Sequence, residues 1–339
     1  MSITEPYVLT NQNAPAFWLI DNLWLPLATG VLTGNQFTLI EQVCATGIGG
    51  PPTHTHTQDE GFYVLEGGCT FQAGGETVKA GPGTFVFVPR LTDHSFVVDK
   101  PNTRVLNFYT PAGFEMILMS IAAPAQERTP PPPNAVPIPP RSIVAELSRE
   151  YGQEAVLGLP FADMPDEKNS VTKASPWNRY KPYGASAADA PTFWQQQILW
   201  SVLASVDQTG GSFSLLEEVC PRLSGPPPHT HDQDEAIYVI DGQITFQAGN
   251  LVSEAPAGAF VYIPRQTVHS FRVDSETARI LNFYLPGGFE QVITTQGQPA
   301  SSRTVPPPEP KEKINQNDLA ALLQATGMRL VAVPDFLRQ

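Results

Sequence analysis

Basic residues, cysteines and long apolar runs are all scarce in this chain of 339 residues. Its 20 Lys and Arg are outnumbered by 33 Asp and Glu, which gives a formal net charge of -13. Nucleic acids and anionic membranes are bound by basic side chains that displace counterions, so the composition argues against both partners. Three cysteines are too few for a secreted disulfide framework, and we expect them to be buried thiols.

Targeting and membrane signals are also missing from the sequence. The N-terminal segment has no basic region followed by an apolar core, and no run of about 18 apolar residues occurs anywhere. We therefore expect a soluble, cytoplasmic protein. The 41% of hydrophobic residues is enough for the cores of one large or two ordinary domains.

An internal repeat decides between one domain and two. The segment TLIEQVC at 38–44 recurs as SLLEEVC at 214–220, and LNFY at 106–109 recurs at 281–284. The repeat is much longer than a solenoid unit, so it indicates a duplicated domain. The expected division is an N-terminal domain over 1–165, a linker over 166–175 and a C-terminal domain over 176–339.

Within each repeat, short runs of alternating apolar residues are separated by glycine turns about every ten residues. This pattern predicts an all-β fold of antiparallel strands, as in a sandwich or jelly roll. A proline-rich arm follows each repeat, at 128–142 and 303–310, and each arm precedes a short helical pattern, at 143–151 and 318–326. We expect each arm to clasp the sister domain or, in a homodimer, a second subunit.

All six histidines of the chain occupy matching positions of the two repeats. The two sets are His54, His56 and His94 in the first repeat, and His229, His231 and His269 in the second. Residues i and i+2 of a strand point to the same side, so each His-Thr-His segment can present both imidazoles to one point. A carboxylate follows each pair, at Glu60 and Glu235. Three imidazoles and one carboxylate, with room for a further ligand, form a ligand set for a catalytic divalent transition metal.

Two motifs around these ligands give each repeat a family resemblance. In the first repeat they are GPPTHTHTQDEGFYVLEG (50–67) and GPGTFVFVPRLTDH (81–94), and in the second GPPPHTHDQDEAIYVIDG (225–242) and APAGAFVYIPRQTVH (255–269). They resemble the two motifs of the cupin superfamily, and the resemblance implies two tandem jelly-roll barrels with short flanking helices. Leu91 and Gln266 depart from the pattern, because the second motif usually has glycine there.

Among two-domain cupins, the overall plan is similar to that of quercetin 2,3-dioxygenases. This resemblance implies one Fe, Mn, Ni, Co or Cu ion per domain, and a flavonol-like aromatic substrate whose heterocycle is opened by O2. It also implies that Glu60 or Glu235 takes the proton of the substrate hydroxyl, as a general base. An oxalate-decarboxylase-like enzyme or an isomerase with the same ligands, and a small-molecule-binding cupin without activity, are the alternatives.

The walls of a substrate pocket are predicted from strand alternation. Phe96 and Phe271 lie two residues beyond the last histidine of each set, and Phe62 and Ile237 lie two residues beyond each glutamate. Such apolar side chains suit a flat polyphenol, but barrel interiors are filled with similar residues, so packing is the competing interpretation.

Overall fold

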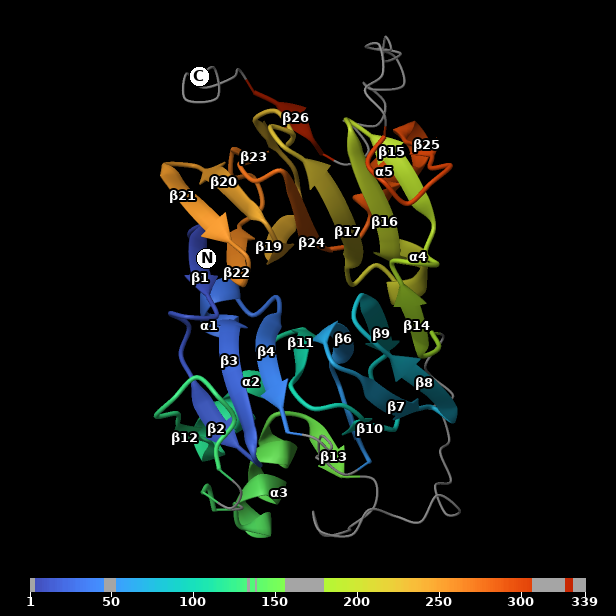
Figure 1. Ribbon diagram of the computed structural model, residues 1–339. Coiled ribbons are helices and arrows are strands. Elements are labelled where there is room, and N and C mark those ends of the chain that lie inside the picture. The colour runs from blue at the N-terminus through green and yellow to red at the C-terminus, as the bar shows by residue number, and fades with distance from the viewer. Residues whose placement is uncertain are drawn as a thin grey trace. The chain divides into compact units, whose positions relative to one another are not determined.

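Figure 1 shows the computed structural model, in which the chain forms two compact units. The structure describes residues 4–45, 53–132, 135–137, 139–155, 180–306 and 327–331. The two units comprise Gln12–Ser186, and Met1–Asn11 together with Ala187–Gln339. The expected linker, 166–175, lies outside the described residues, so its place stays a prediction.

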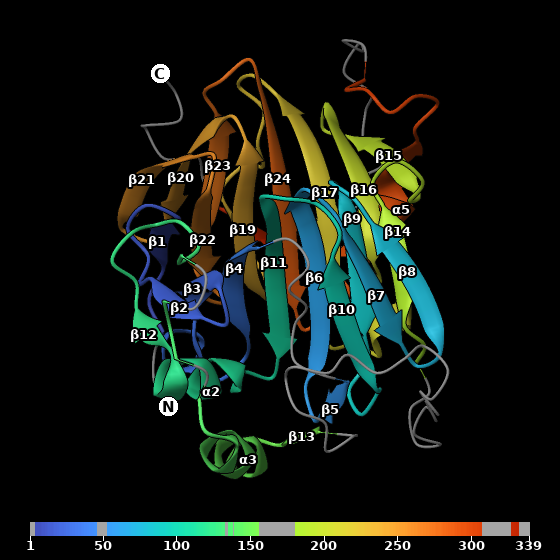
Figure 2. The ribbon, with the colours of Figure 1, turned by 60° about the horizontal axis from the view of Figure 1, so that its bottom comes forward.

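The N-terminal barrel is built from an eight-stranded and a five-stranded antiparallel sheet. Its larger sheet, which can be followed in Figure 2, has the order β12 (Ala123–Pro124), β2 (Phe17–Leu19), β3 (Asn22–Ala28), β4 (Thr38–Cys44), β11 (Thr103–Thr110), β6 (Asp59–Glu66), β9 (Thr84–Val88) and β14 (Tyr183–Ser186). Its smaller sheet has the order β13 (Gln153–Ala155), β5 (His54–His56), β10 (His94–Val98), β7 (Cys69–Ala73) and β8 (Glu76–Ala80).

The C-terminal barrel repeats this plan strand by strand. Its larger sheet has the order β1 (Tyr7–Thr10), β22 (Ala259–Ile263), β19 (Asp234–Asp241), β24 (Thr277–Leu285), β17 (Ser214–Pro221), β16 (Ile198–Ala204), β15 (Thr192–Gln195) and β25 (Gln298–Pro299). Its smaller sheet has the order β21 (Leu251–Pro256), β20 (Gln243–Ala248), β23 (His269–Val273), β18 (His229–Thr230) and β26 (Arg329–Leu330). The prediction of two tandem jelly-roll barrels is confirmed.

The core of each barrel lies between its two sheets, as strand alternation requires. In the N-terminal barrel, Phe62 and Val64 of the larger sheet pack in one buried cluster with Phe71 and Phe96 of the smaller sheet. Glu60 shares the inward face of β6 with Phe62 and Val64 because all three alternate along the strand. The same alternation that fills the core therefore turns the ligand carboxylate inward.

The first strand of each repeat pairs within the barrel of the other repeat. β1, near the start of the chain, pairs with β22, and its Tyr7 ring lies 5.5 Å from that of Tyr262. β14, the equivalent strand of the second repeat, pairs with β9, and its Tyr183 ring lies 5.7 Å from that of Phe87. The described residues 4–11 are thus part of the C-terminal unit, although the sequence division places them in the N-terminal domain.

The short helices are α1 (Gly30–Thr33), α2 (Phe114–Ile121), α3 (Arg141–Glu150), α4 (Val206–Thr209) and α5 (Glu290–Gln296). The helix predicted at 143–151 corresponds to α3, and the one predicted at 318–326 lies outside the described residues.

The start of each arm contacts its own barrel, and the expected clasp of the arms on the sister domain stays a prediction. The indole of Trp18 donates to the carbonyl of Thr129 at 2.8 Å, and the indole of Trp194 donates to that of Thr304 at 2.9 Å. After α3, β13 pairs with β5 and so covers the free edge of a strand that carries two histidines. A contact of an arm with a second subunit stays a prediction.

Two expectations from composition can be compared with the structure. The three cysteines are buried and free, as expected. In the part of the chain that the structure describes, no helix has the length and apolarity needed to cross a membrane.

The pairing of β1 with the C-terminal barrel makes a testable prediction. Tyr7→Ala should destabilise that barrel by about 2 to 3 kcal/mol, because the contacts of its half-buried ring with Phe260 and Tyr262 are lost. Tyr183→Ala is the matched variant and should destabilise the N-terminal barrel instead. Hydrogen exchange followed by mass spectrometry shows which barrel each variant destabilises. Loss of protection in the N-terminal barrel of Tyr7→Ala, or in the C-terminal barrel of Tyr183→Ala, would contradict the pairing.

Candidate metal centres

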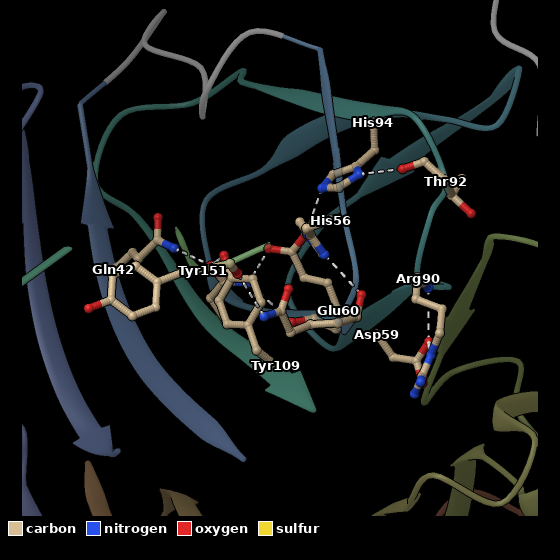
Figure 3. Close-up of polar contacts among 12 residues, drawn as sticks. Gln42, His56, Asp59, Glu60, Arg90, Thr92, His94, Tyr109 and Tyr151 are labelled. Carbon is tan, nitrogen blue, oxygen red and sulfur yellow. Dashed lines mark hydrogen bonds and ion pairs between the residues drawn. The ribbon is translucent and has the colours of Figure 1, made fainter. Parts of the chain in front are cut away.

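Three strands bring the ligands of the N-terminal centre together from both sheets. His54 and His56 come from β5, His94 comes from the adjacent β10, where it pairs directly with His54, and Glu60 comes from β6 of the larger sheet. All four side chains are buried, and their ligand atoms lie within 4.8 Å of one another. Figure 3 shows His56, Glu60 and His94 converging on one point. The cluster predicted from the spacing of the histidines is confirmed.

Backbone carbonyls fix which nitrogen two of the three imidazoles present to the centre. The Nδ1 atom of His56 lies 2.9 Å from the carbonyl of Gln58, and that of His94 lies 2.8 Å from the carbonyl of Thr92. Since a carbonyl can only accept, each Nδ1 carries the hydrogen, and each Nε2 is left with its lone pair. This tautomer is the one that binds a metal through Nε2.

The facing atoms of this cluster require a cation or a proton between them. Oε2 of Glu60 lies 3.0 Å from Nε2 of His56 and 2.7 Å from Nε2 of His94. Nε2 of His94 is buried, and its close contact with Glu60 does not have the geometry of a hydrogen bond. Lone pairs of two nitrogens and a carboxylate oxygen repel one another unless a positive charge lies between them. The donor set therefore fits a divalent transition metal.

The charges within the cluster support this interpretation. Burial alone would raise the pKa of Glu60, but the adjacent imidazoles of His94 and His56 hold it well below its usual range. Burial alone would lower the pKa of His94, but the carboxylate of Glu60 raises it. Glu60 is therefore an anion, ready to coordinate a cation.

A buried polar network holds the other oxygen of Glu60 in place. The side-chain amide of Asn107 on β11 donates to Oε1 of Glu60 at 2.9 Å. The Asn107 carbonyl in turn accepts hydrogen bonds from Gln42 on β4 at 2.6 Å and from the hydroxyl of Tyr109 at 2.9 Å. These partners keep the carboxylate in a single orientation, which is how residues behind the ligands tune a metal site.

The C-terminal centre repeats this geometry with His229, His231, Glu235 and His269, which are also buried. Oε2 of Glu235 lies 3.0 Å from Nε2 of His231 and 2.7 Å from Nε2 of His269, and Asn282 donates to its Oε1 at 2.7 Å. Burial and the neighbouring His269 lower the pKa of His229 to about 3, so this ring is neutral and able to ligate. One residue behind the ligands differs, because Glu218 takes the place of Gln42.

The departures from the cupin motif at Leu91 and Gln266 fall at tight turns. Both have left-handed backbones, with φ of 60° and 65°. Their N–H groups donate to the carbonyls of His56 and His231 at 2.7 and 2.9 Å, so these turns support the ligand strands. Glycine suits this backbone best, but the turn forms without it.

The four predicted pocket residues are buried near the centres. Phe62 and Phe96 belong to the core cluster of the N-terminal barrel, and Ile237 and Phe271 to that of the C-terminal barrel. The rings of Phe62 and Phe96 lie 5.4 Å apart. A pocket role for them stays a prediction, because core packing by itself accounts for their burial.

Arginines near the ligand strands are engaged in ion pairs. Arg90 forms a two-pronged pair with Asp59, which points away from the histidines in Figure 3, and Arg265 forms the same pair with Asp234. Among the described residues, no lysine or arginine side chain is buried.

Sequence reasoning missed the residues behind the ligands. Asn107 and Tyr109 lie in the repeated LNFY segment, which had served only to align the two halves. The sequence does contain a signal for these residues. An asparagine within an otherwise apolar strand is expected to be buried, and a buried amide needs polar partners.

Taken together, the two jelly-roll barrels and their buried clusters define a protein with two metal-binding centres, one in each barrel. The Cupin domain family matches residues 42–109 and 215–284, so each barrel carries one copy of this domain.

Relatives and solved structures agree with this assignment. The chain is 25% identical over 309 residues to quercetin 2,3-dioxygenase of Bacillus subtilis (strain 168), and the match covers 89% of this chain and 88% of the relative. Oxalate decarboxylase of Bacillus subtilis has a TM-score of 0.58 at 12% identity, over 85% of this chain and 79% of that chain. Procruciferin, an 11S globulin from Brassica napus, has a TM-score of 0.55 at 12% identity, over 84% and 85%. At these identities, the solved structures show a shared fold.

The separation of the ligand sets into two barrels predicts independent metal binding. His54→Ala should remove the metal of the N-terminal centre alone, and His229→Ala that of the C-terminal centre alone. Metal analysis of each purified variant should give half the content of the unaltered protein. Loss of both metals from either single variant would contradict independent centres.

The hydrogen bond from Asn107 to Glu60 makes a further prediction. Asn107→Leu keeps the volume of the side chain but leaves Oε1 of Glu60 without its donor, so metal affinity at the N-terminal centre should fall about 10- to 100-fold. Calorimetric titration of the chelator-treated variant measures this affinity, and the unaltered C-terminal centre is the internal control. Unchanged affinity would mean that this donor does not tune the centre.

Proposed function

We propose that the protein is a metal-dependent dioxygenase that opens the heterocycle of a flavonol-like aromatic substrate with O2. The observation that carries the proposal is a buried cluster of three imidazoles and a carboxylate beside aromatic core residues, with no buried cation among the described residues. The 25% identity to a quercetin 2,3-dioxygenase over nearly the whole chain supports it.

The ligand set supplies the chemistry that such a reaction needs. When bound, a divalent Fe, Mn, Ni, Co or Cu ion would act as a Lewis acid and a template for the substrate oxygen and O2. His54, His56, His94 and Glu60 would hold it in the N-terminal barrel, and their equivalents would do so in the C-terminal barrel.

We assign the proton acceptor for the substrate hydroxyl to Glu60 and, in the second barrel, to Glu235. Each carboxylate is anionic because the neighbouring imidazoles lower its pKa, and Asn107 or Asn282 orients its second oxygen. A carboxylate held in one orientation next to the bound hydroxyl suits general-base catalysis.

The surroundings of the centre favour an aromatic substrate over a small dianion such as oxalate. Binding of a buried dianion needs cationic partners, because a buried charge without them is strongly disfavoured. Arg90 and Arg265 are held by Asp59 and Asp234, and the interior of the N-terminal barrel contains the clustered rings of Phe62, Phe71 and Phe96. Stacking against such rings suits a flat polyphenol.

The proposal predicts oxygen-dependent turnover of quercetin. Metal-free protein is reconstituted separately with each of the five metals and incubated with quercetin, with and without O2. With at least one metal, loss of flavonol absorbance should require O2 and should be matched by release of carbon monoxide. Oxalate is the comparison substrate, and CO2 release from oxalate without quercetin turnover would instead favour a decarboxylase.

Single variants identify the centre that turns over the substrate. Glu60→Gln or Glu235→Gln in the active centre should lower the rate at least about 100-fold, because an amide cannot accept the proton. The metal content of each variant is measured in parallel. Full turnover in both variants with metal retained would contradict the assigned base.

A further inference from the structure

The two centres differ in one ionisable residue behind their ligands. Gln42 on β4 and Glu218 on β17 occupy equivalent positions of the repeat, and each contacts the asparagine that bonds the ligand carboxylate. Gln42 is a neutral donor to the Asn107 carbonyl, whereas Oε1 of Glu218 lies 3.1 Å from the amide nitrogen of Asn282. The C-terminal centre therefore contains a second carboxyl group.

Among the described residues, no lysine or arginine forms an ion pair with Glu218. Its side chain is fully buried, and its other oxygen contacts the thiol of Cys220 at 3.7 Å. The titratable groups that face it are Cys220 on its own strand, Glu235 on β19 and Tyr284 on β24, while its partner on β16 is Trp200. Burial raises the pKa of Glu218 to about 8; the hydrogen bonds from Asn282 and Cys220 oppose this rise, and the charge of Glu235 adds to it.

A single amide group links Glu218 to the ligand. The side-chain nitrogen of Asn282 lies 2.7 Å from Oε1 of Glu235 and 3.1 Å from Oε1 of Glu218. A divalent cation held by Glu235 would lie close to Glu218 and would favour its ionised form, because a nearby opposite charge stabilises the anion. The N-terminal centre cannot respond in this way, because the Gln42 amide has no proton to lose near neutral pH.

We propose that Glu218 makes the C-terminal centre a proton-coupled metal site: it is a neutral carboxylic acid without metal, and it loses its proton to solvent when a divalent cation binds. The O–H bond of Glu218 breaks, the proton leaves to buffer, and the remaining carboxylate adds a negative charge behind Glu235. The N-terminal centre, with Gln42, binds the same cation without this additional proton release.

The test counts the protons released by each centre. Two proteins are prepared without metal: H54A/H94A, which keeps the C-terminal centre, and H229A/H269A, which keeps the N-terminal centre. Each is titrated with Co(II) at about pH 7 by calorimetry, in buffers of different ionisation enthalpy, which gives the number of protons released. The C-terminal centre should release up to about one proton more than the N-terminal centre when Co(II) binds. Its affinity for Co(II) should therefore rise with pH more steeply than that of the N-terminal centre, by up to about a further tenfold per pH unit.

Exchanging the two residues provides matched controls. E218Q in the C-terminal centre should remove the additional proton, and Q42E should introduce it in the N-terminal centre. Since each variant installs the residue that the other barrel already tolerates, both should fold, and circular dichroism verifies this. Equal proton release by the two centres, or a count that neither exchange alters, would overturn the proposal.

A second readout needs no metal. A carboxyl group whose pKa is raised in the folded protein favours folding most at low pH, and this contribution is lost as the pH rises toward the folded value of about 8. The metal-free C-terminal barrel should therefore lose stability between about pH 5 and pH 8 more steeply than its E218Q variant. An identical pH profile for both would also overturn the proposal. Neither readout depends on the substrate, so failure of the oxygenase proposal would leave this test intact.

Discussion

The contact between a buried carboxylate and two imidazoles joins the two sheets of each barrel. Glu60 projects from the larger sheet and His56 and His94 from the smaller one, and their facing atoms lie 2.7 to 3.0 Å apart. The carbonyls that fix the imidazole tautomers belong to turns next to the ligand strands. The turns set the imidazole tautomers, and the strand register brings the imidazoles opposite the carboxylate. A cation between them satisfies the lone pairs of all these ligand atoms.

Much of this centre could be predicted from the sequence, because its signals are local. Alternation along a strand fixes that His54 and His56 share a side, and the same rule turns Glu60 inward with Phe62. The same spacing of three histidines and a glutamate recurs in the second repeat. The polar partners behind the ligands were missed because they come from distant strands, such as Gln42 on β4 and Asn107 on β11.

Strand pairing at the sheet edges could not be predicted for a different reason. β1 and β14 are equivalent strands of the two repeats that share only their first tyrosine, and both repeats offer an equivalent edge, at β9 and β22. A local pattern specifies that a strand will pair but not which of two similar edges it joins. The place of the arms also depends on long-range contacts, such as the hydrogen bond from the indole of Trp18 to the carbonyl of Thr129.

Duplication also shows where the two barrels have been free to differ. The ligands, the asparagine behind each glutamate and the tyrosine beside it are the same in both centres, so the direct coordination chemistry is held constant. Gln42 and Glu218, which differ, lie one hydrogen bond behind the asparagine that bonds the ligand glutamate. A change of charge at this position alters the electrostatic environment of the ligand carboxylate without displacing it. A residue at that distance can change the proton balance of a centre while the ligand geometry is preserved, because it acts through the field and through one shared amide.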